Sequence, residues 1–328
     1  MSAVKTLIVQ KAEAGMRLDR WFKTHYPMIG HGRLEKLLRT GQVRVDGGRA
    51  KAGQRIETGA RIRIPPLGDD PAGPPKDRRG PRPSVSREDI AALEARILHM
   101  DDHVIVINKP AGLPVQGGSK TTKHLDGMLG ALQYGKPERP RLVHRLDKDT
   151  SGVLVLARDR RTATRLGDVF RSKSANKLYW ALVAGVPRPR WGRIDAPLEK
   201  LGDHQGERVE YSEGGKRAIT EYAVIEAAGS RAAWLVLRPL TGRTHQLRVH
   251  CKVLGTPIVG DGKYGGSECF LSGVSGKMHL HARSISIPLP SGKMIEVSAP
   301  IDGHMLTTWK MFDFNADYND DPFADALA

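Results

Sequence analysis

The densest run of chemically active side chains spans residues 141–158, RLVHRLDKDTSGVLVLAR. It places histidine, arginine, lysine and the two aspartates Asp147 and Asp149 directly before an apolar stretch that reads as a β-strand at 150–157. A loop at the end of a rigid strand fixes the geometry of its side chains while leaving them reachable by a ligand. The cluster is therefore the first candidate for catalysis, and the plain alternative is a strand end stabilised by salt bridges.

Three chemistries suit carboxylates in such a loop. The DTSG run that begins at Asp149 resembles an aspartic protease loop, but that mechanism needs two carboxylates that share a proton, and the sequence offers no second copy. Asp147 and Asp149 together could bind Mg²⁺, although Arg145 and Lys148 beside them would weaken a site for a dication. The third is a single carboxylate that acts as a nucleophile.

Two other patterns point to cofactors and are weaker. The glycine-containing loop after residues 103–108 lacks a lysine directly after its closing glycine, which a nucleotide-phosphate loop requires. Five histidine and cysteine residues have spacings that fit no zinc ribbon or finger: His245, His250, Cys251, His279 and His281. We expect neither a metal ion nor a cofactor.

The run HRLDKDTSG at 144–152 resembles the HRLDxxTSG signature of the RluA/RluC/RluD family of pseudouridine synthases. Three more blocks are similar to that family in the same order: NKPAGLPV at 108–115, KLYWALVAG at 177–185, and RPLTGRTHQLRVH followed by GTPIVGDGKYGG between 238 and 266. One departure is Gln116, where the family often has histidine, and we expect it to change a local contact only.

The resemblance implies an isomerase that converts uridine to pseudouridine without a cofactor. Asp147 would attack the target nucleotide, and Arg145 would enter the space that the flipped uridine leaves. Tyr179 would stack on the base, Arg243 would pair with Asp147 and keep it ionised, and Leu247 would pack near the flipped ring. The matching blocks supply four further expected substrate contacts, of which the last is the alternative partner of Asp147: Lys109, His144, Lys177 and Arg248.

These implied roles agree with the chemistry of the reaction. A uracil inside a stacked helix cannot be detached, turned and rejoined through C5, so the nucleotide must leave the stack at a cost of roughly a few kcal/mol. Cleavage of a glycosidic bond develops oxocarbenium character, which a nearby carboxylate stabilises and can trap. A single aspartate at position 147 meets that need.

A small basic unit precedes the catalytic motifs. Residues 1–65 contain 14 Lys/Arg and 5 Asp/Glu, a net charge of +9. Apolar residues at helical spacing predict two short helices, and alternating residues after them predict a small sheet. The segments RLDRWF, GRLEKLLRTGQVRVDG and GARIRIP resemble the S4 RNA-binding domain. Six basic residues among the apolar positions are expected to form a phosphate-binding surface: Arg17, Arg20, Arg33, Lys36, Arg39 and Arg44.

The rest of the chain divides by composition. A proline-, glycine- and charge-rich stretch predicts a linker at 66–87, and residues 313–328, with five aspartates and no basic residue, predict a disordered acidic tail. Between them, at 88–312, strands outnumber helices and often follow one another directly. We predict an α+β fold, in which the S4-like domain at 1–65 is linked to a mixed, largely antiparallel β-sheet catalytic domain.

Composition also restricts the partners. The net charge of +16 favours a polyanion, and the absence of a long apolar window excludes a membrane span. Only Cys251 and Cys269 occur, with no secretory signal, which favours the cytoplasm. An S4-like unit before this catalytic domain resembles the RluC/RluD branch, and KMHLHARSISIPLPSGKMIEVSAP is more similar to RluC. The resemblance implies ribosomal RNA of the large subunit, or its precursors, as the partner of a monomer.

Two rival functions remain open from the sequence. One is a catalytically inactive ribosome assembly factor that binds ribosomal RNA, and the other is an RNA-binding hydrolase that uses Asp147 for cleavage. The reaction products distinguish these functions. An isomerase conserves the mass of the RNA while it replaces the C5 proton, an assembly factor leaves the uridine unchanged, and a hydrolase leaves an abasic or broken strand. Which uridines are modified is not encoded in any motif, since RNA recognition depends on shape.

Overall fold

The computed structural model describes residues 4–67, 85–117, 123–202, 208–289 and 292–324. The chain divides into two compact units, Met1–Arg82 and Pro83–Ala328, each with its own apolar core. No helix among the described residues is long and apolar enough to cross a membrane.

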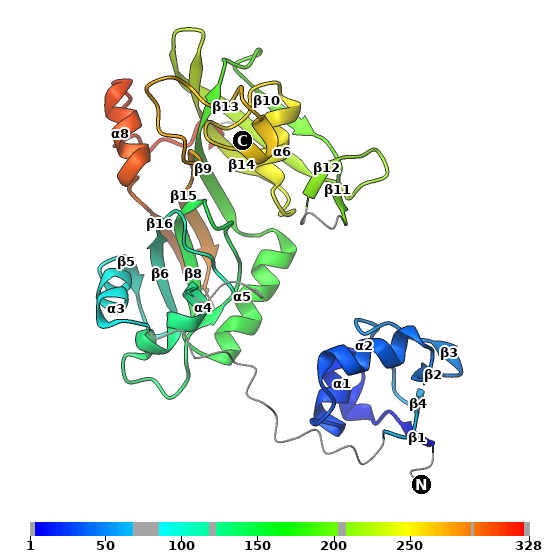
Figure 1. The fold of residues 1–328 in the computed structure, drawn as a ribbon. Helices are drawn as coiled ribbons and strands as arrows, with labels where there is room; N and C mark the ends of the chain where they lie inside the picture. The colour runs from blue at the N-terminus through cyan, green and yellow to red at the C-terminus, as the bar shows by residue number, and fades with distance from the viewer. Residues whose placement is uncertain (1–3, 68–84, 118–122, 203–207, 290–291, 325–328) are drawn as a thin grey trace. The chain divides into compact units, whose positions relative to one another are not determined.

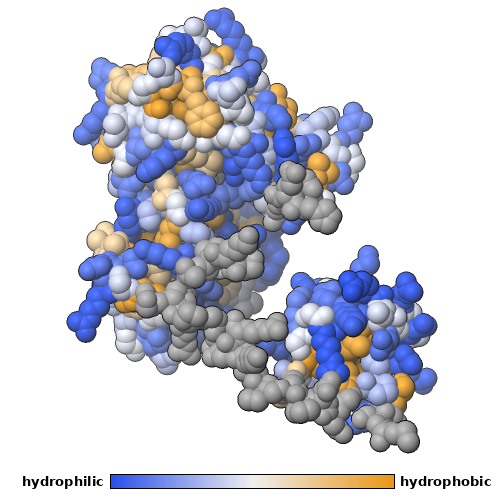
Figure 2. All heavy atoms as spheres, in the orientation of Figure 1, coloured by the Kyte–Doolittle hydropathy of each residue, from blue (hydrophilic) through white to orange (hydrophobic). Residues whose placement is uncertain are grey.

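The first unit combines two helices with a small sheet, as the sequence predicts (Figure 1). Its elements are β1 (Lys5–Ile8), the 3-10 turn η1 (Lys11–Glu13), α1 (Leu18–His25), α2 (His31–Arg39), β2 (Arg44–Val45), β3 (Gly48–Arg49) and β4 (Arg61–Ile64). The sheet has the order β1-β4-β2-β3. The apolar sides of both helices close over it, through Leu18, Trp21, Phe22, Leu34 and Leu38. In Figure 2 hydrophilic residues dominate the visible surface of this unit.

Residues 68–84 of the predicted linker lie outside the described residues. Its last residues are not linker, because α3 (Arg87–Glu94) begins there. The Ser86 side chain accepts a hydrogen bond from the backbone N–H of Asp89 and caps the helix. The catalytic unit therefore starts a few residues earlier than composition indicates.

The second unit is built on a ten-stranded sheet. Its strands are β5 (Ile97–Met100), β6 (Val104–Lys109), β7 (Arg141–Leu142), β8 (Ser151–Ala157), β9 (Asn176–Ala184), β10 (Trp191–Asp195), β13 (Ile219–Ala228), β14 (Ala232–Pro239), β15 (Leu280–Pro288) and β16 (Met294–Ser298). The main order is β10-β13-β14-β9-β15-β8-β6-β5, with β16 on β15 and β7 on β8. Among the described strands β15 and β8 pair in parallel and the other pairs are antiparallel. The predicted mixed, largely antiparallel sheet is confirmed.

Helices cover both faces of this sheet. They are α3, α4 (Leu125–Met128), the 3-10 turn η2 (Leu129–Gln133), α5 (Arg160–Ser172), α6 (Gln246–Val253), α7 (Gly262–Gly265) and α8 (Gly303–Met311). In the β6–β8 half, α4 packs on one face and α5 on the other. In the β9–β14 half, α6 and α8 occupy opposite faces. A separate hairpin, β11 (Leu198–Leu201) with β12 (Arg208–Tyr211), packs on α6 and α7.

The C-terminal segment corrects the prediction of a disordered tail. Phe314 and Phe323 are buried in the core beneath α8. Arg238 of β14 forms an ion pair with Asp321, and Arg283 of β15 donates a hydrogen bond to Asn319. These cations come from strands far away in the sequence, so the local charge count could not reveal them. Only residues 325–328 of this segment lie outside the described residues.

Candidate active site

A cavity of about 500 Å³ lies where α6 meets the sheet, and segments distant in sequence form its walls. They are residues 114–116 after β6, the loop 144–150 before β8, the start of β9, and the turn 239–248 between β14 and α6. The volume is within the range of small-ligand sites. Of the nine catalytic and substrate-binding residues predicted for this unit, eight line the cavity, and Lys109 does not.

Asp147 faces the cavity with 29% of its side chain exposed. Its Oδ2 accepts a hydrogen bond from Nη1 of Arg248 at 3.3 Å and lies 3.7 Å from Nε2 of His245. Oδ1 accepts no hydrogen bond from any described residue. One carboxylate oxygen is thus anchored by a cation while the other is available to a ligand.

The expected ion pair between Arg243 and Asp147 is wrong, and Arg248 takes that position. Gln246 explains the difference, since its side chain accepts a hydrogen bond from the backbone N–H of Arg243 and fixes the turn before α6. Arg243 lies in this turn, and its Nε–H donates a hydrogen bond to the carbonyl of Arg217. Arg248 lies in α6 itself and is directed at Asp147.

Arg248 is held from behind by a second carboxylate. Asp261 is almost fully buried, and its two oxygens accept from Nε and Nη2 of Arg248 at 2.8 and 2.7 Å. The guanidinium also lies 4.9 Å from the centre of the Tyr264 ring. Burial opposes the charge of Arg248, but hydrogen bonds and charges from Asp261 and Asp147 raise its pKa above the ordinary value. Asp147 therefore faces a permanent, rigidly placed cation.

The prediction that Lys109 contacts substrate is also wrong. Its side chain is fully buried, and Nζ donates to three backbone carbonyls, those of Pro110, Leu113 and Lys148. Burial lowers the pKa of Lys109 to about 8, against the attraction of Asp149 and Asp147. Because Lys148 directly follows Asp147, this lysine fixes the catalytic loop and does not reach the cavity.

His144 likewise holds the loop. Its Nε2 accepts a hydrogen bond from the backbone N–H of Val155 in β8, and its ring stacks on Phe170 with centroids 4.5 Å apart. Burial, with the charge of Lys177, lowers the pKa of His144 to about 3, so the ring is neutral at physiological pH. With one nitrogen bonded to backbone and one face covered, His144 holds the loop in place, and because it also lines the cavity its substrate contact stays a prediction.

Tyr179, Lys177 and Leu247 also line the cavity. Tyr179 lies on β9 between β14 and β15. Burial and the charge of Asp147 raise the pKa of Tyr179, so its phenol stays protonated. Lys177 is half-buried two residues earlier on the same face of the strand, and burial lowers its pKa. Leu247 is buried at the start of α6 and gives this wall an apolar patch.

Arg145 is exposed at the mouth of the cavity. Its Nη1 donates to Oε1 of Gln116 at 3.3 Å. This contact involves the residue at which the sequence departs from the family pattern. The side chain is thereby directed across the cavity mouth.

The six basic residues of the first unit are all solvent-exposed. Arg17 forms an ion pair with Asp19, and Arg44 donates to the carbonyls of Gly41 and Gly47. Arg33, Lys36 and Arg39 occupy exposed positions along α2, whose buried residues are Leu34 and Leu38.

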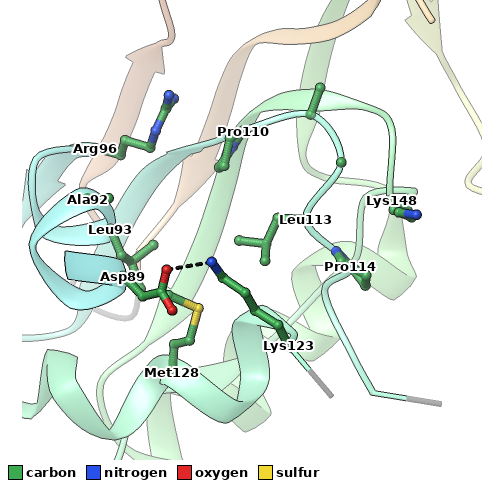
Figure 3. Close-up of a pocket in the computed structure, with 12 residues that line it drawn as sticks. Asp89, Ala92, Leu93, Arg96, Pro110, Leu113, Pro114, Lys123, Met128 and Lys148 are labelled. Carbon is green, nitrogen blue, oxygen red and sulfur yellow. Dashed lines mark hydrogen bonds and ion pairs between the residues drawn. The ribbon is translucent and has the colours of Figure 1, made fainter. Parts of the chain in front are cut away.

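A second cavity, of about 560 Å³, lies on the other side of the loop that follows β6 (Figure 3). Its floor is apolar, with Leu93, Leu113 and Met128, and the ion pair between Lys123 and Asp89 crosses it. It shares Pro114 and Lys148 with the cavity at Asp147. Among the described residues no three histidine, cysteine or acidic side chains lie together as a metal site would require.

Three residues of the site were not predicted: Asp261, Tyr264 and His245. The first two lie in the block GTPIVGDGKYGG, whose position was noted without a chemical role. His245 was considered only as a zinc ligand. The presence of acid, phenol and imidazole close to a matching block was the available signal, but their convergence on Asp147 depends on how α6 and α7 pack.

The chain is similar to several known proteins. The family described as RNA pseudouridylate synthase matches residues 103–252. An Escherichia coli protein named ribosomal large subunit pseudouridine synthase C is 36% identical over 92% of this chain and 94% of its own length. An Arabidopsis thaliana protein named RNA pseudouridine synthase 4, mitochondrial, is 38% identical over 82% of this chain and 70% of its own. The solved structure of human RNA pseudouridylate synthase domain containing 4 has a TM-score of 0.58 at 32% identity, covering 68% of this chain and 95% of that one.

Proposed function

The chain belongs to the RNA pseudouridylate synthase family, whose members are isomerases that convert uridine to pseudouridine, and we propose that it acts on large-subunit ribosomal RNA with Asp147 as nucleophile. The substrate is taken from the name of the Escherichia coli relative, which aligns over most of both chains. The single observation that carries the proposal is the pair of Asp147 oxygens, one anchored by Arg248 and one open to the cavity.

In the proposed reaction the free oxygen of Asp147 attacks C1′ of a uridine that has left its helix. The N1–C1′ bond breaks, and its electron pair remains on the uracil. The base turns, C5 forms the new bond to C1′ as the carboxylate leaves, C5 loses its proton, and N1 gains one. Arg248 supports this sequence because it stabilises the carboxylate both before attack and after release.

Tyr179 and Leu247 are proposed to hold the base. The protonated phenol of Tyr179 offers a flat ring, and Leu247 adds an apolar surface to the cavity lining. Aromatic stacking on a flipped base contributes about 1–3 kcal/mol. The base therefore stays in the cavity while it is detached from the ribose.

Arg145 is proposed to fill the gap that the flipped nucleotide leaves, and Arg243 and Lys177 to contact the RNA. Arg145 and Arg243 are exposed at the cavity mouth, where phosphates of the target strand would pass. Lys177 forms no ion pair with a described residue, so its ammonium is available to an anion or to a uracil carbonyl.

The first unit is proposed to act as an S4-like RNA clamp. Its net charge of +9 and the exposure of its six basic residues support contact with phosphates. Two buried free cysteines, Cys251 and Cys269, support the further proposal that the protein acts in the reducing cytoplasm.

Mapping of pseudouridines tests the proposed substrate. The purified protein is incubated with unmodified large-subunit and small-subunit ribosomal RNA, and pseudouridines are located by carbodiimide labelling. We expect new signals at discrete uridines of the large-subunit RNA alone. Binding without any new pseudouridine would instead indicate an inactive assembly factor, and strand cleavage or base loss would indicate a hydrolase.

A further inference from the structure

His245 lies in the turn before α6, faces the cavity at Asp147, and has no role in the mechanism above. Its backbone adopts φ 53° and ψ 19°, a left-handed conformation that side chains with a Cβ rarely take. Such strain persists where the surroundings impose it, and it often occurs at functional sites.

The side chain of Gln246 imposes this backbone. It is buried, and its oxygen accepts from Oγ1 of Thr241 at 2.7 Å while its nitrogen donates to the carbonyl of Ile219 and to Oγ1 of Thr220. The turn is thereby tied to β13. The imidazole of His245 is held toward the cavity as a consequence.

Tyr264 is the hydrogen-bond partner of Nδ1 of His245. Tyr264 Oη lies 2.6 Å from Nδ1 of His245 and also accepts from the backbone N–H of Val209 at 3.3 Å. Burial raises the pKa of Tyr264, so its single hydroxyl proton is present. With that proton donated to Nδ1 of a neutral imidazole, the ring proton resides on Nε2.

The neutral form is the one favoured by the surroundings. Burial lowers the pKa of His245 below its ordinary value, Asp147 and Asp261 act in the opposite direction, and Arg248 and Lys263 lower it further. Nε2–H therefore points toward Oδ2 of Asp147, but at 3.7 Å it is too far away for a hydrogen bond. Oδ2 is already bonded to Arg248, so this donor is left for a ligand.

We propose that Nε2–H of His245 donates a hydrogen bond to a carbonyl oxygen of the target uracil and holds the base while it is detached from the ribose. The inference rests on the proposed isomerisation at Asp147. When the N1–C1′ bond breaks, the electron pair left on the uracil spreads onto its carbonyl oxygens, and a neutral donor already in place stabilises that charge. No proton moves to or from His245, since Nδ1 is bonded to Tyr264 and Nε2 keeps its hydrogen. Removal of the C5 proton is left to another group.

The test compares three variants of the full chain in single-turnover release of C5 tritium, with RNA affinity measured separately. His245→Phe retains a ring but has no donor, and the rate should fall about 100-fold, as for the loss of one preorganised donor, while affinity stays within threefold. His245→Gln returns an N–H near the position of Nε2, and the rate should recover to within tenfold of the original protein. Tyr264→Phe breaks the same His–Tyr bond but keeps the imidazole, and it should lose less than His245→Phe.

Substrate atoms give the sharper comparison. The RNA fragment that carries a uridine mapped as above is prepared with uridine, 2-thiouridine or 4-thiouridine at that position, because sulfur accepts hydrogen bonds more weakly than oxygen. The original protein should slow on one of the two thio substrates, and His245→Phe should show no further loss on that one. Additive losses on both, or a Gln variant as slow as the Phe variant, would overturn the inference. If the original protein releases no tritium from the uridine fragment, the proposed function fails instead.

Discussion

Replacement of Arg248 and Arg243 by methionine, one at a time, distinguishes the role of Arg248 in α6 from that of Arg243 in the turn before it. Arg248 bridges Asp147 and Asp261, and both oxygens of Asp261 depend on it. Arg243 is exposed and donates one hydrogen bond to the carbonyl of Arg217. Methionine keeps most of the length of either side chain and removes its charge.

The expected magnitudes differ because the two environments differ. Arg248→Met leaves Asp261, whose side chain is 1% exposed, with a buried and unpaired charge, and breaking such a pair costs about 3–5 kcal/mol of unfolding free energy. Loss of the charged hydrogen bond to Asp147 should also slow the reaction by roughly 10- to 150-fold, the equivalent of about 1.5–3 kcal/mol. Arg243→Met should change the unfolding free energy by about 0.5 kcal/mol or less and act mainly on RNA binding.

Urea unfolding followed by tryptophan fluorescence measures the first quantity, since four of the five tryptophans lie in the catalytic unit. Single-turnover tritium release measures the second. Adding Asp261→Asn to Arg248→Met removes the orphaned charge, and the double variant should regain about 2 kcal/mol of stability while the rate stays low. Full activity and stability in Arg248→Met, with loss of rate confined to Arg243→Met, would refute this reading of the site.

Three more perturbations test other parts of the account. Lys109→Met leaves three carbonyls without their donor and should lower the unfolding free energy by about 2–4 kcal/mol in a urea titration. Lys123→Met breaks only the exposed ion pair with Asp89 and should have a much smaller effect in the same titration, so equal costs would contradict the anchoring role of Lys109. Burial lowers the pKa of His279 and of His281 to about 4. As the pH falls below about 6.5, these histidines therefore become protonated in the unfolded chain before they do in the folded chain. The contribution of these two histidines to the unfolding free energy should be constant above pH 6.5 and fall toward pH 4 by up to about 3 kcal/mol for each, and a titration that is flat or rises as the pH falls between 6.5 and 4 would disagree. A chain reduced to residues 83–328, the second unit with the Ser86 cap of α3, should fold and turn over at saturating RNA. Its plot of log affinity against log salt should flatten by roughly 0.7–0.9 for each lost phosphate contact, and unchanged affinity and slope would exclude the first unit as an RNA clamp.

Local patterns predicted the elements whose partners are close in the sequence. The spacing of Leu18, Trp21 and Phe22 predicted α1, and the apolar run that follows the DTSG loop predicted β8. The order of the ten strands could not be predicted from local patterns, because it depends on pairings such as β15 with β8 between residues more than 100 positions apart. There Gly152, at φ 106°, leaves no room for a Cβ against the backbone of Ala282, which gives a physical reason for glycine after Ser151.

The errors in the site have the same origin. Arg243 and Arg248 flank the start of one helix, and no local rule says which of them faces Asp147 once α6 is placed. Lys109 lies in a motif block but is used inward, as a donor to backbone, to keep the catalytic loop in place. Asp147 could be assigned because the run HRLDKDTSG around it resembles the family signature, which is readable without the fold.

The most direct test of the account is tritium release from C5-labelled large-subunit ribosomal RNA by the original chain and by Asp147→Asn. Asparagine preserves the shape of the side chain and its place beside Arg248, but it lacks the anion that attacks the nucleotide. We expect the original chain to release tritium without breaking the RNA, and Asp147→Asn to bind the RNA with similar affinity and release none above background. Substantial release by Asp147→Asn would contradict the assignment of Asp147 as the nucleophile.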